Sequence, residues 1–318
     1  MNFSTIKGHR RNINFLLKLL EGQRFFHSYL FSGVEGCGKK LVALAFARRI
    51  LCIDKMSDEC DCESCRMFRK NVHPDFRLVD YAFQSSLLGE DVEEQKSIKI
   101  STIREIIRFS SMNPSVSGKK VIIIDDAHKM VVEAQNALLK TLEEPGQTSI
   151  FILISPSPGL LLPTVVSRCH TINFAALSEK DVEEILIEKG FEPVMARQCS
   201  ESSGGSVMLA LKHMEIFRTI KEFSNLGPIA PFAITAKIIK MAIPQEAVRW
   251  LIDVVDSRIN KIIYSDIPAE MREKGIRIVK DNMKYRNFLR HNVNARIISF
   301  LVLQRYLSFR KEISAFVK

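Results

Sequence analysis

Apolar residues in the first 175 positions fall into short continuous runs that alternate with helix-like segments. Continuous apolar runs are typical of strands that are buried on both faces of a parallel sheet. The sequence therefore predicts an α/β fold, a parallel sheet with helices on both faces. The predicted strands are His27–Gly33, Asp75–Phe83, Lys119–Asp126, Ser149–Ser155 and Cys169–Phe174. The predicted helices are Leu41–Leu51, Ile103–Met112 with a Thr102–Glu105 capping box, and Glu133–Glu144, which Pro145 and Gly146 end.

The rest of the chain has a helical pattern. Ser178–Lys189 and Val194–Leu211 are amphipathic, the second being interrupted at Ser202–Ser206, and strand-like runs almost disappear after about position 215. Gln84–Lys96 is polar and acidic, which predicts a surface loop. These changes predict three parts: an α/β core over 1–175, a small helical domain over 176–214 and an all-helical domain over 215–318.

Composition and charge narrow the class of protein. Only 14 glycines and 11 prolines occur in 318 residues, which excludes collagen-like and linker-dominated chains. No apolar run approaches the roughly 18 residues of a membrane helix, and the start lacks the apolar core of a signal peptide, so we expect a cytoplasmic protein. The net charge of +10 lies entirely in residues 216–318, which contain 19 Lys and Arg and 9 Asp and Glu. The 215 residues before them are neutral.

A glycine-rich segment follows the first predicted strand. Gly33, Gly36, Gly38 and Lys39 match the phosphate-loop pattern G-x-x-x-x-G-K between a strand and a helix. Glycines let successive backbone N–H groups turn toward phosphate oxygens, and the lysine would reach the terminal phosphates. The next position usually carries a hydroxyl that binds Mg²⁺, but here it is Lys40. Binding of ATP or ADP therefore stays open, with a glycine turn that holds no ligand as the alternative, and hydrolysis is not expected.

Two acidic residues end the third predicted strand. Asp125 matches the acid that holds the water shell of the metal in phosphate-loop proteins. Hydrolytic proteins of this class usually have glutamate next, as the base or the group that orients water. Asp126 is one methylene shorter and would reach less far.

Four cysteines lie close together after the predicted phosphate-loop helix. Cys52, Cys60, Cys62 and Cys65 have the spacing C-x7-C-x-C-x2-C. Four thiolates form a closed tetrahedral Zn²⁺ site, with no position left for a substrate, so we expect structural zinc. An iron–sulfur cluster and unrelated thiols are the alternatives.

Two strings in the first part, together with the cysteine insert, are specific to one family. Asn136–Pro145 (NALLKTLEEP) and Leu162–Cys169 (LPTVVSRC) resemble the bacterial DNA polymerase III clamp loader. The resemblance implies an AAA+ core, a helical lid and a helical collar that joins five subunits. It also implies partners, namely motor subunits of the γ/τ type and a δ subunit in a hetero-pentamer. Such a complex loads the sliding clamp onto primed DNA and involves no membrane.

Three departures from the motor subunits fall on the machinery for the chain's own nucleotide. Lys39-Lys40 replaces Lys-Thr or Lys-Ser, Asp125-Asp126 replaces Asp-Glu, and Met208 takes the place of a phosphate-sensing arginine in the lid. The cysteine spacing also departs from the usual C-x8-C-x2-C-x2-C of the family. These losses imply a subunit with no activity of its own within the DNA-directed DNA polymerase holoenzyme.

The Ser167-Arg168-Cys169 motif of the family is intact. The resemblance implies that Arg168 acts in trans, entering the ATP site of a neighbouring subunit and stabilising charge on the γ-phosphate. A chain that keeps this arginine and loses its own chemistry resembles the δ′ type of subunit, a non-hydrolysing stator. Ser155 matches a polar sensing position, and a residual strand-end hydroxyl is the alternative for it.

Two other functions remain open at this point. One is a competent AAA+ ATPase of the motor type, and the other is a free-standing zinc protein that binds nucleic acid. The basic last third is consistent with a solvated helical face, a collar surface that meets acidic neighbours, or a DNA contact.

Overall fold

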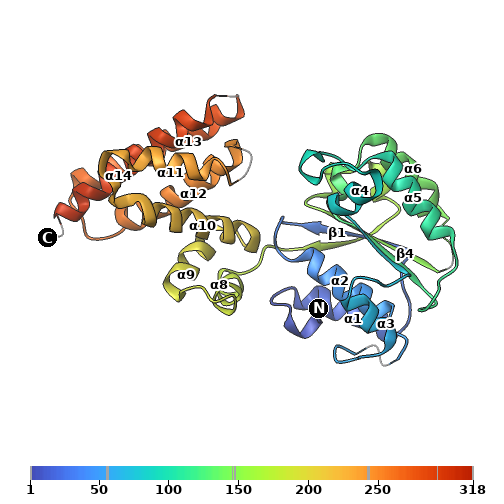
Figure 1. Ribbon diagram of the computed structural model, residues 1–318. Coiled ribbons are helices and arrows are strands. Elements are labelled where there is room, and N and C mark those ends of the chain that lie inside the picture. The colour runs from blue at the N-terminus through green and yellow to red at the C-terminus, as the bar shows by residue number, and fades with distance from the viewer. Residues whose placement is uncertain are drawn as a thin grey trace. The chain divides into compact units, whose positions relative to one another are not determined.

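The computed structural model describes residues 2–54, 57–144, 146, 148–241, 244–291 and 293–316, without the side chain of Glu94. The chain divides into two compact units, Met1–Asp181 and Val182–Lys318. Figure 1 shows a sheet covered by helices in the first unit, and helices in the second.

A five-stranded parallel sheet forms the centre of the first unit. Its strands lie in the order β2-β3-β4-β1-β5, and every pair of neighbours is parallel. Their continuous apolar sequences follow from this position, because all residues of β3 and β4 are buried. The strands are β1 (Ser28–Gly33), β2 (Phe76–Val79), β3 (Lys120–Ile124), β4 (Ser149–Ser155) and β5 (His170–Phe174).

Helices cover both faces of this sheet, as Figure 1 shows, with α4, α5 and α6 on one face and α1, α2 and α3 on the other. The core on the first face joins residues of α5 and α6 to alternate residues of the strands, such as Ile106, Leu138 and Phe151. The helices are α1 (Arg10–Glu21), α2 (Lys39–Ile50), α3 (Glu63–Arg69), α4 (Tyr81–Leu88), α5 (Ile100–Ser111), α6 (Val132–Glu143) and α7 (Pro163–Val166). The predicted parallel sheet with helices on both faces is confirmed.

The prediction of one long strand over Asp75–Phe83 is wrong in its second half. The strand ends at Val79, and Asp80 begins helix α4, its carboxylate accepting a hydrogen bond from Phe83 N at 3.0 Å. Aspartate is a favoured residue at this position because its side chain satisfies an N–H group that the helix leaves unpaired. The change places Asp80 at the carboxyl end of β2, beside Asp125 at the end of β3.

The segment predicted as a polar surface loop, Gln84–Lys96, contains a buried residue. Gln84 is fully buried, and its Oε1 accepts hydrogen bonds from Lys99 N at 2.7 Å and from Thr102 Oγ1 at 2.8 Å. The predicted capping box at Thr102 is therefore wrong, since α5 begins at Ile100 and the Thr102 hydroxyl bonds to Gln84 instead.

The second unit is helical throughout its described residues. Ser206 begins α10 by accepting a hydrogen bond from Leu209 N, after the predicted interruption at Ser202–Ser206. Its helices are α8 (Glu179–Glu188, which begins in the first unit), α9 (Pro193–Ser202), α10 (Val207–Phe223), α11 (Ala230–Ile238), α12 (Pro244–Ile263), α13 (Ala269–Arg290) and α14 (Ala295–Phe316). The predicted boundary between residues 214 and 215 lies within α10, and the division into lid and collar stays a prediction.

None of the described helices is both long enough and apolar enough to cross a bilayer.

Candidate functional site

The glycine-rich segment forms a turn between β1 and α2 at the carboxyl end of the sheet. Gly33, Gly36 and Gly38 all have positive φ angles, of 147°, 74° and 104°. At Gly33 the fit is also tight, because a Cβ atom there would lie 2.0 Å from the carbonyl oxygen of Phe174 on β5. Only glycine satisfies both the backbone angle and this close approach. The predicted phosphate-loop geometry is therefore dictated locally by its glycines.

Lys39, at the first position of α2, has its side chain folded into this turn. It is only 6% exposed, and its Nζ donates hydrogen bonds to Gly33 O at 2.6 Å and Val34 O at 2.8 Å. Burial lowers the pKa of Lys39, and neighbouring acids, including Glu35, partly oppose that shift. The ammonium thus satisfies the carbonyls of its own loop.

Lys40 contacts two carboxylates at the ends of neighbouring strands. Its Nζ lies 2.9 Å from Asp125 Oδ2 and 3.4 Å from Asp80 Oδ2. Burial opposes the charge on Lys40, but the hydrogen bond and charge of Asp125, with those of Asp80, raise the pKa of this lysine overall. The ammonium therefore lies between two acids that directly follow β2 and β3.

The residues at this position do not fit the divalent cation that the fold family implies. A magnesium ion here needs oxygen ligands and room for its water molecules. Lys40 replaces the expected hydroxyl ligand, and its ammonium already lies at hydrogen-bond distance from the Asp125 carboxylate. A second cation beside the same oxygen atom would be repelled.

Asp126 and Ser155, the other two residues predicted for nucleotide chemistry, follow β3 and end β4. Asp126 follows Asp125 in a left-handed conformation, with φ of 46°, and burial, with the charge of Asp125, raises its pKa. Ser155 is fully buried at the end of β4, and its Oγ donates to Ser157 O at 2.8 Å. This contact favours the reading of Ser155 as a strand-end hydroxyl.

His9 also contacts the phosphate-loop turn, and the sequence pattern gave no indication of it. Its Nε2 lies 2.7 Å from Cys37 O, and its ring packs edge-on against Phe174. A carbonyl oxygen only accepts, so Nε2 carries the proton. Burial lowers the pKa of His9, which keeps the ring neutral near pH 7.

The arginine of the Ser-Arg-Cys motif is held by contacts to both its backbone and its side chain. Ser28 Oγ, at the start of β1, donates to Arg168 O at 2.5 Å. The guanidinium donates from Nε to Glu143 Oε1 at 2.7 Å and from Nη1 to Thr164 O at 2.8 Å, while Nη2 also contacts Glu143. The side chain of Arg168 remains 31% exposed. Ser167 Oγ turns back to Thr164 O, and burial raises the pKa of the Cys169 thiol to about 11.

Arg168 lies at the amino ends of the strands, whereas the phosphate-loop turn lies at their carboxyl ends. It is tied to Ser28, which begins β1, whereas Gly33 ends the same strand. Five steps along a strand separate their backbones by roughly 16 Å. Because β1 and β5 are parallel, the residue just before β5 lies at the amino ends of the strands, away from the turn. The structure brings Lys39, Lys40 and Asp125 together and keeps Arg168 apart from them.

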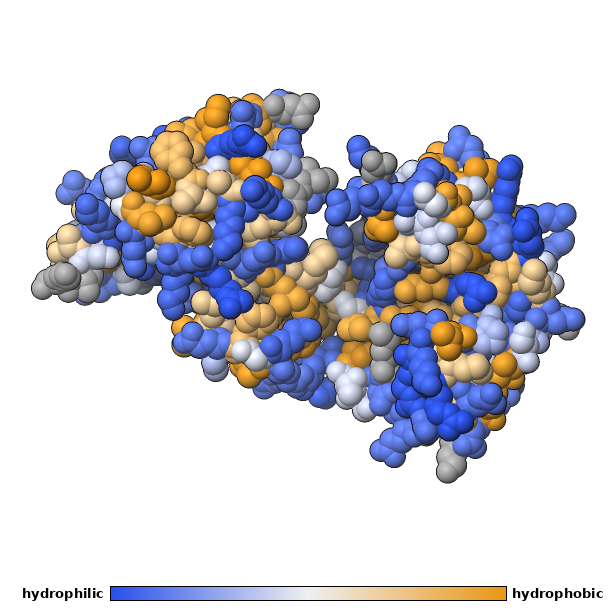
Figure 2. Space-filling view, in the orientation of Figure 1, coloured by the Kyte–Doolittle hydropathy of each residue, from blue (hydrophilic) through white to orange (hydrophobic). Residues whose placement is uncertain are grey.

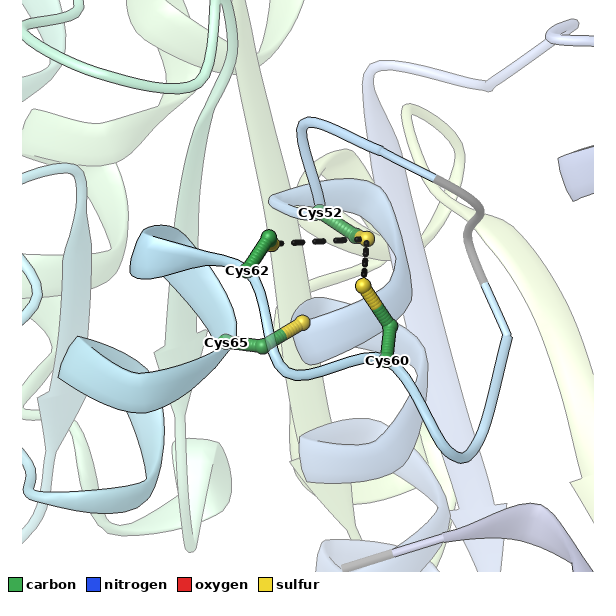
Figure 3. Close-up of side chains that lie close together, drawn as sticks. All are labelled: Cys52, Cys60, Cys62 and Cys65. Carbon is green, nitrogen blue, oxygen red and sulfur yellow. Dashed lines mark hydrogen bonds between the residues drawn. The ribbon is translucent and has the colours of Figure 1, made fainter.

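The four cysteines of the insert surround a common centre. Their Sγ atoms all lie within 4.8 Å of one another, with Cys52 Sγ at 3.5 Å from Cys60 Sγ and 3.9 Å from Cys62 Sγ. Figure 3 shows the four side chains pointing toward each other from the end of α2, the insert loop and the start of α3. With Zn–S bonds of about 2.3 Å, tetrahedral sulfurs lie about 3.8 Å apart. The arrangement therefore fits a zinc ion.

The thiols of the cluster differ in acidity. For Cys62, burial acts to raise the pKa, but hydrogen bonds from the backbone N–H groups of Cys65 and Ile53 lead the effects that lower it to about 7. For Cys65, burial, with hydrogen bonds and charge from Cys62 and Cys52, raises the pKa, so the thiolate that a metal requires is favoured at Cys62. The insert is tied to the phosphate-loop helix through Arg48, which is 1% exposed and donates from Nη2 to Asp58 O at 3.1 Å. Arg49 Nη1 adds an ion pair with Asp58 Oδ1 at 3.2 Å.

The fold and the loop geometry define the class of the protein. A parallel five-stranded sheet with a glycine loop at the carboxyl end of a central strand, followed by helices, is an AAA+ type of nucleotide-binding fold. A DNA polymerase III gamma-subunit-related protein of Thermotoga maritima has the same fold, with a TM-score of 0.54 and 17% sequence identity over 93% of this chain and 98% of that one.

The family follows from the sequence comparison. A family model described as "DNA polymerase III, delta subunit" matches residues 8–178, more than half of the chain. The chain belongs to this family, which is part of the DNA polymerase III clamp-loader group.

Two curated relatives are also similar in sequence to this chain. DNA polymerase III subunit delta′ of Bacillus subtilis is 35% identical over 188 residues, covering 59% of this chain and 54% of the relative. DNA polymerase III subunit tau of the same organism is 32% identical over 215 residues, covering 64% of this chain and 35% of the relative. The chain thus aligns with about half of the delta′ relative and about a third of the tau relative.

Proposed function

We propose that this chain acts as the δ′-type stator of a DNA polymerase III clamp loader, in a hetero-pentamer with γ/τ-type motor subunits and a δ subunit in the cytoplasm. Arg168 supplies the neighbouring motor subunit with a positive charge at its ATP site. The complex opens the sliding clamp and places it on primed DNA, while the chain itself does not hydrolyse ATP.

The position of Arg168 is the single observation that carries this proposal. The arginine lies at the amino ends of the strands, whereas Gly33 and the loop that follows it lie at the carboxyl ends. A side chain anchored there does not serve the nucleotide loop of its own chain. Its side chain is 31% exposed and is held by Glu143 on α6. A neighbouring subunit that contacts this end of the sheet can therefore reach the guanidinium.

The contacts of Lys40 support the loss of hydrolysis. The ammonium is paired with Asp125, the residue expected to organise the metal's water shell. Next to it, Asp126 lacks the reach of a glutamate, and Met208 in the first turn of α10 offers no charge at the position of the sensing arginine. Three groups of the chain's own machinery are therefore replaced or engaged elsewhere.

The helical second unit is the part that we assign to assembly. Figure 2 shows apolar side chains lying among polar ones on the surface of this unit. A groove of about 500 Å³ lies between α11 and α14, with Phe232 at 62% exposed and Ile297 at 56% exposed on its walls. Lys240 and Arg296 also line this groove, so its apolar side chains have a polar rim, as those of interaction sites do.

The cysteine insert receives a structural role. Zinc held by all four thiolates has no open position, so it would stabilise the insert loop against α2 and α3 and take no part in a reaction. We assign the insert the task of fixing the end of the phosphate-loop helix, to which Arg48 and Asp58 also tie it.

Two alternative functions make different predictions for the chain alone. A motor-type ATPase would hydrolyse ATP with Mg²⁺ at the rate of clamp-loader motors. A free-standing nucleic-acid-binding protein would bind DNA with strong salt dependence and would form no stable complex with loader subunits. We expect neither behaviour.

The direct test is reconstitution of the loader with the Arg168→Ala variant. We expect ATP turnover stimulated by clamp and primed DNA to fall while the complex still assembles. Unchanged turnover in an intact complex would remove the role assigned to Arg168.

A further inference from the structure

Lys40 has an unusual setting for a lysine at the start of a helix. It projects from the first turn of α2 toward the ends of β2 and β3, where Asp80 and Asp125 accept from its Nζ at 3.4 and 2.9 Å. The side chain of Lys40 is 40% exposed, and those of Asp80 and Asp125 are 29% and 20% exposed. Each carboxylate also accepts a backbone hydrogen bond, Asp80 Oδ1 from Phe83 N at 3.0 Å and Asp125 Oδ1 from Asp126 N at 3.1 Å.

The two acids come from neighbouring strands, and both lie at the carboxyl edge beside the glycine loop. Two carboxylates at this edge are the kind of ligand set that attracts a hard divalent cation. Here a covalently attached ammonium lies between them. A divalent ion at the same oxygen atoms would be repelled by the positive charge of Lys40, whose Nζ lies 2.9 Å from Asp125 Oδ2.

We propose that the Lys40 ammonium is a resident cation that takes the place of the divalent metal, so that the loop binds a nucleoside polyphosphate in its metal-free form. This inference rests on the proposed loss of ATP hydrolysis by the chain. Lys40 offsets one of the two negative charges of Asp80 and Asp125, which weakens their repulsion toward phosphate oxygens. The backbone N–H groups of the glycine loop and the start of the twelve-residue helix α2 then face the phosphates.

An ammonium differs from a magnesium ion in two ways that matter for this site. It carries one charge instead of two, and it donates hydrogen bonds but cannot bind and activate water as a Lewis acid. The substitution therefore allows a nucleotide to be held without being hydrolysed. It also discriminates against the Mg²⁺ complex of the nucleotide, because that complex carries its cation into the space that Lys40 occupies.

The experiment measures the binding of a fluorescent ATP analogue to the full chain, once with EDTA and once with Mg²⁺. For the wild type, we expect the analogue to bind at least as tightly in EDTA as in Mg²⁺. For Lys40→Thr, which restores the hydroxyl ligand, we expect affinity in EDTA to fall by about tenfold or more and Mg²⁺ to recover it. Lys40→Met removes the charge without adding a ligand, and we expect weak binding in both conditions.

Three results would overturn the inference. The first is a wild type whose affinity rises tenfold on addition of Mg²⁺, and the second is a wild type that binds the analogue in neither condition. The third is a Lys40→Met variant that binds in EDTA as the wild type does. Thermal unfolding of each variant shows whether it is folded. A general loss of structure would weaken binding of the analogue with and without Mg²⁺ in both variants, whereas we expect Mg²⁺ to restore binding in Lys40→Thr alone. The role of Arg168, at the opposite edge of the sheet, is unaffected by any of these outcomes.

Discussion

Arg168 is restrained by a single acidic partner, and the strength of that restraint decides how easily the arginine reaches a neighbour. Glu143 Oε1 accepts from both Nε and Nη2, but both side chains are partly exposed, at 31% for Arg168 and 46% for Glu143. Exposed ion pairs contribute about 0–1 kcal/mol. The contact therefore orients the guanidinium without trapping it.

A change at Glu143 should accordingly have a small effect. In a reconstituted loader, we expect Glu143→Gln to alter stimulated ATP turnover by less than about fivefold, since 1 kcal/mol corresponds to roughly that factor. Steady-state turnover with clamp and primed DNA measures it. If Glu143→Gln abolished turnover as completely as Arg168→Ala, Glu143 would have a direct role in the reaction instead of an orienting one.

At the residue scale, the sequence could predict which groups are present but not which groups meet. The replacement of a hydroxyl by Lys40 is visible in the motif itself. Its pairing with Asp80, 40 positions away, is not visible, because it depends on where β2 ends and on the neighbouring order of β2 and β3. The contact of Arg168 with Glu143 cannot be predicted from the sequence for the same reason, because the two residues are 25 positions apart and only the tertiary structure brings them together.

At the scale of elements, the sequence predicts that a strongly periodic or continuous apolar segment forms a helix or a strand, but it predicts the residues at which that element begins and ends less well. The five strands follow from apolar runs, because a strand between two layers of helices tolerates few polar residues. The end of β2 was missed because Asp80 reads as part of the strand, while its carboxylate in fact begins α4. Gln84 was missed because a polar residue in a polar segment gives no sign that tertiary contacts bury it.

The cysteine insert is an element whose stability we expect to depend on metal. The protein purified without added metal should contain about one zinc per chain, and Cys60→Ser should lose it, since a closed site uses all four thiolates. Metal analysis with a chromophoric chelator measures the content. Cys199→Ala, in the buried core of the second unit, is the matched control and should retain zinc. Iron in place of zinc, or equal zinc in wild type and Cys60→Ser, would contradict the assignment.

Helix α10 contains a buried histidine that makes the second unit sensitive to acid. His213 is fully buried, with Nδ1 at 2.8 Å from Ser202 Oγ, and Asp253 Oδ2 lies 3.8 Å from Nε2, too far for a hydrogen bond. Burial lowers the pKa of His213 to about 4, from 6.5. The folded state favours the neutral ring, so the free energy of unfolding should decrease as pH falls from about 6.5 to about 4, by up to roughly 3 kcal/mol.

Chemical denaturation at a series of pH values, for the wild type and for His213→Leu, tests this expectation. Burial also raises the pKa of Asp253 and Asp256, which therefore titrate in the opposite sense. The difference between the two proteins cancels that contribution. We expect the difference to change across this pH range, and parallel curves would show that His213 does not contribute.

At the scale of the whole molecule, charge and function are assigned to different parts. The loop, the acids, the cysteines and Arg168 all belong to the first unit, whereas the excess positive charge belongs to residues 216–318 in the second. The excess charge therefore lies apart from every predicted site residue. The sequence predicted a helical last third, but its groove between α11 and α14 depends on packing that no local pattern reveals.

The central claim is that this chain contributes an arginine to another subunit and no hydrolysis of its own. The most direct measurement compares clamp- and DNA-stimulated ATP turnover of loaders that contain wild type, Arg168→Ala or Arg108→Ala. Arg108 serves as a control because its side chain is 70% exposed on α5, pairs with Glu105 of the same helix and is not part of the Ser-Arg-Cys motif.

A transition-state donor contributes about 10²–10³ in rate at the site it serves. The other motor sites keep their own donors, so bulk turnover in Arg168→Ala should fall severalfold, with assembly by size-exclusion chromatography unchanged and Arg108→Ala equal to wild type. An Arg168→Ala loader that assembles and hydrolyses ATP at the wild-type rate would contradict the account.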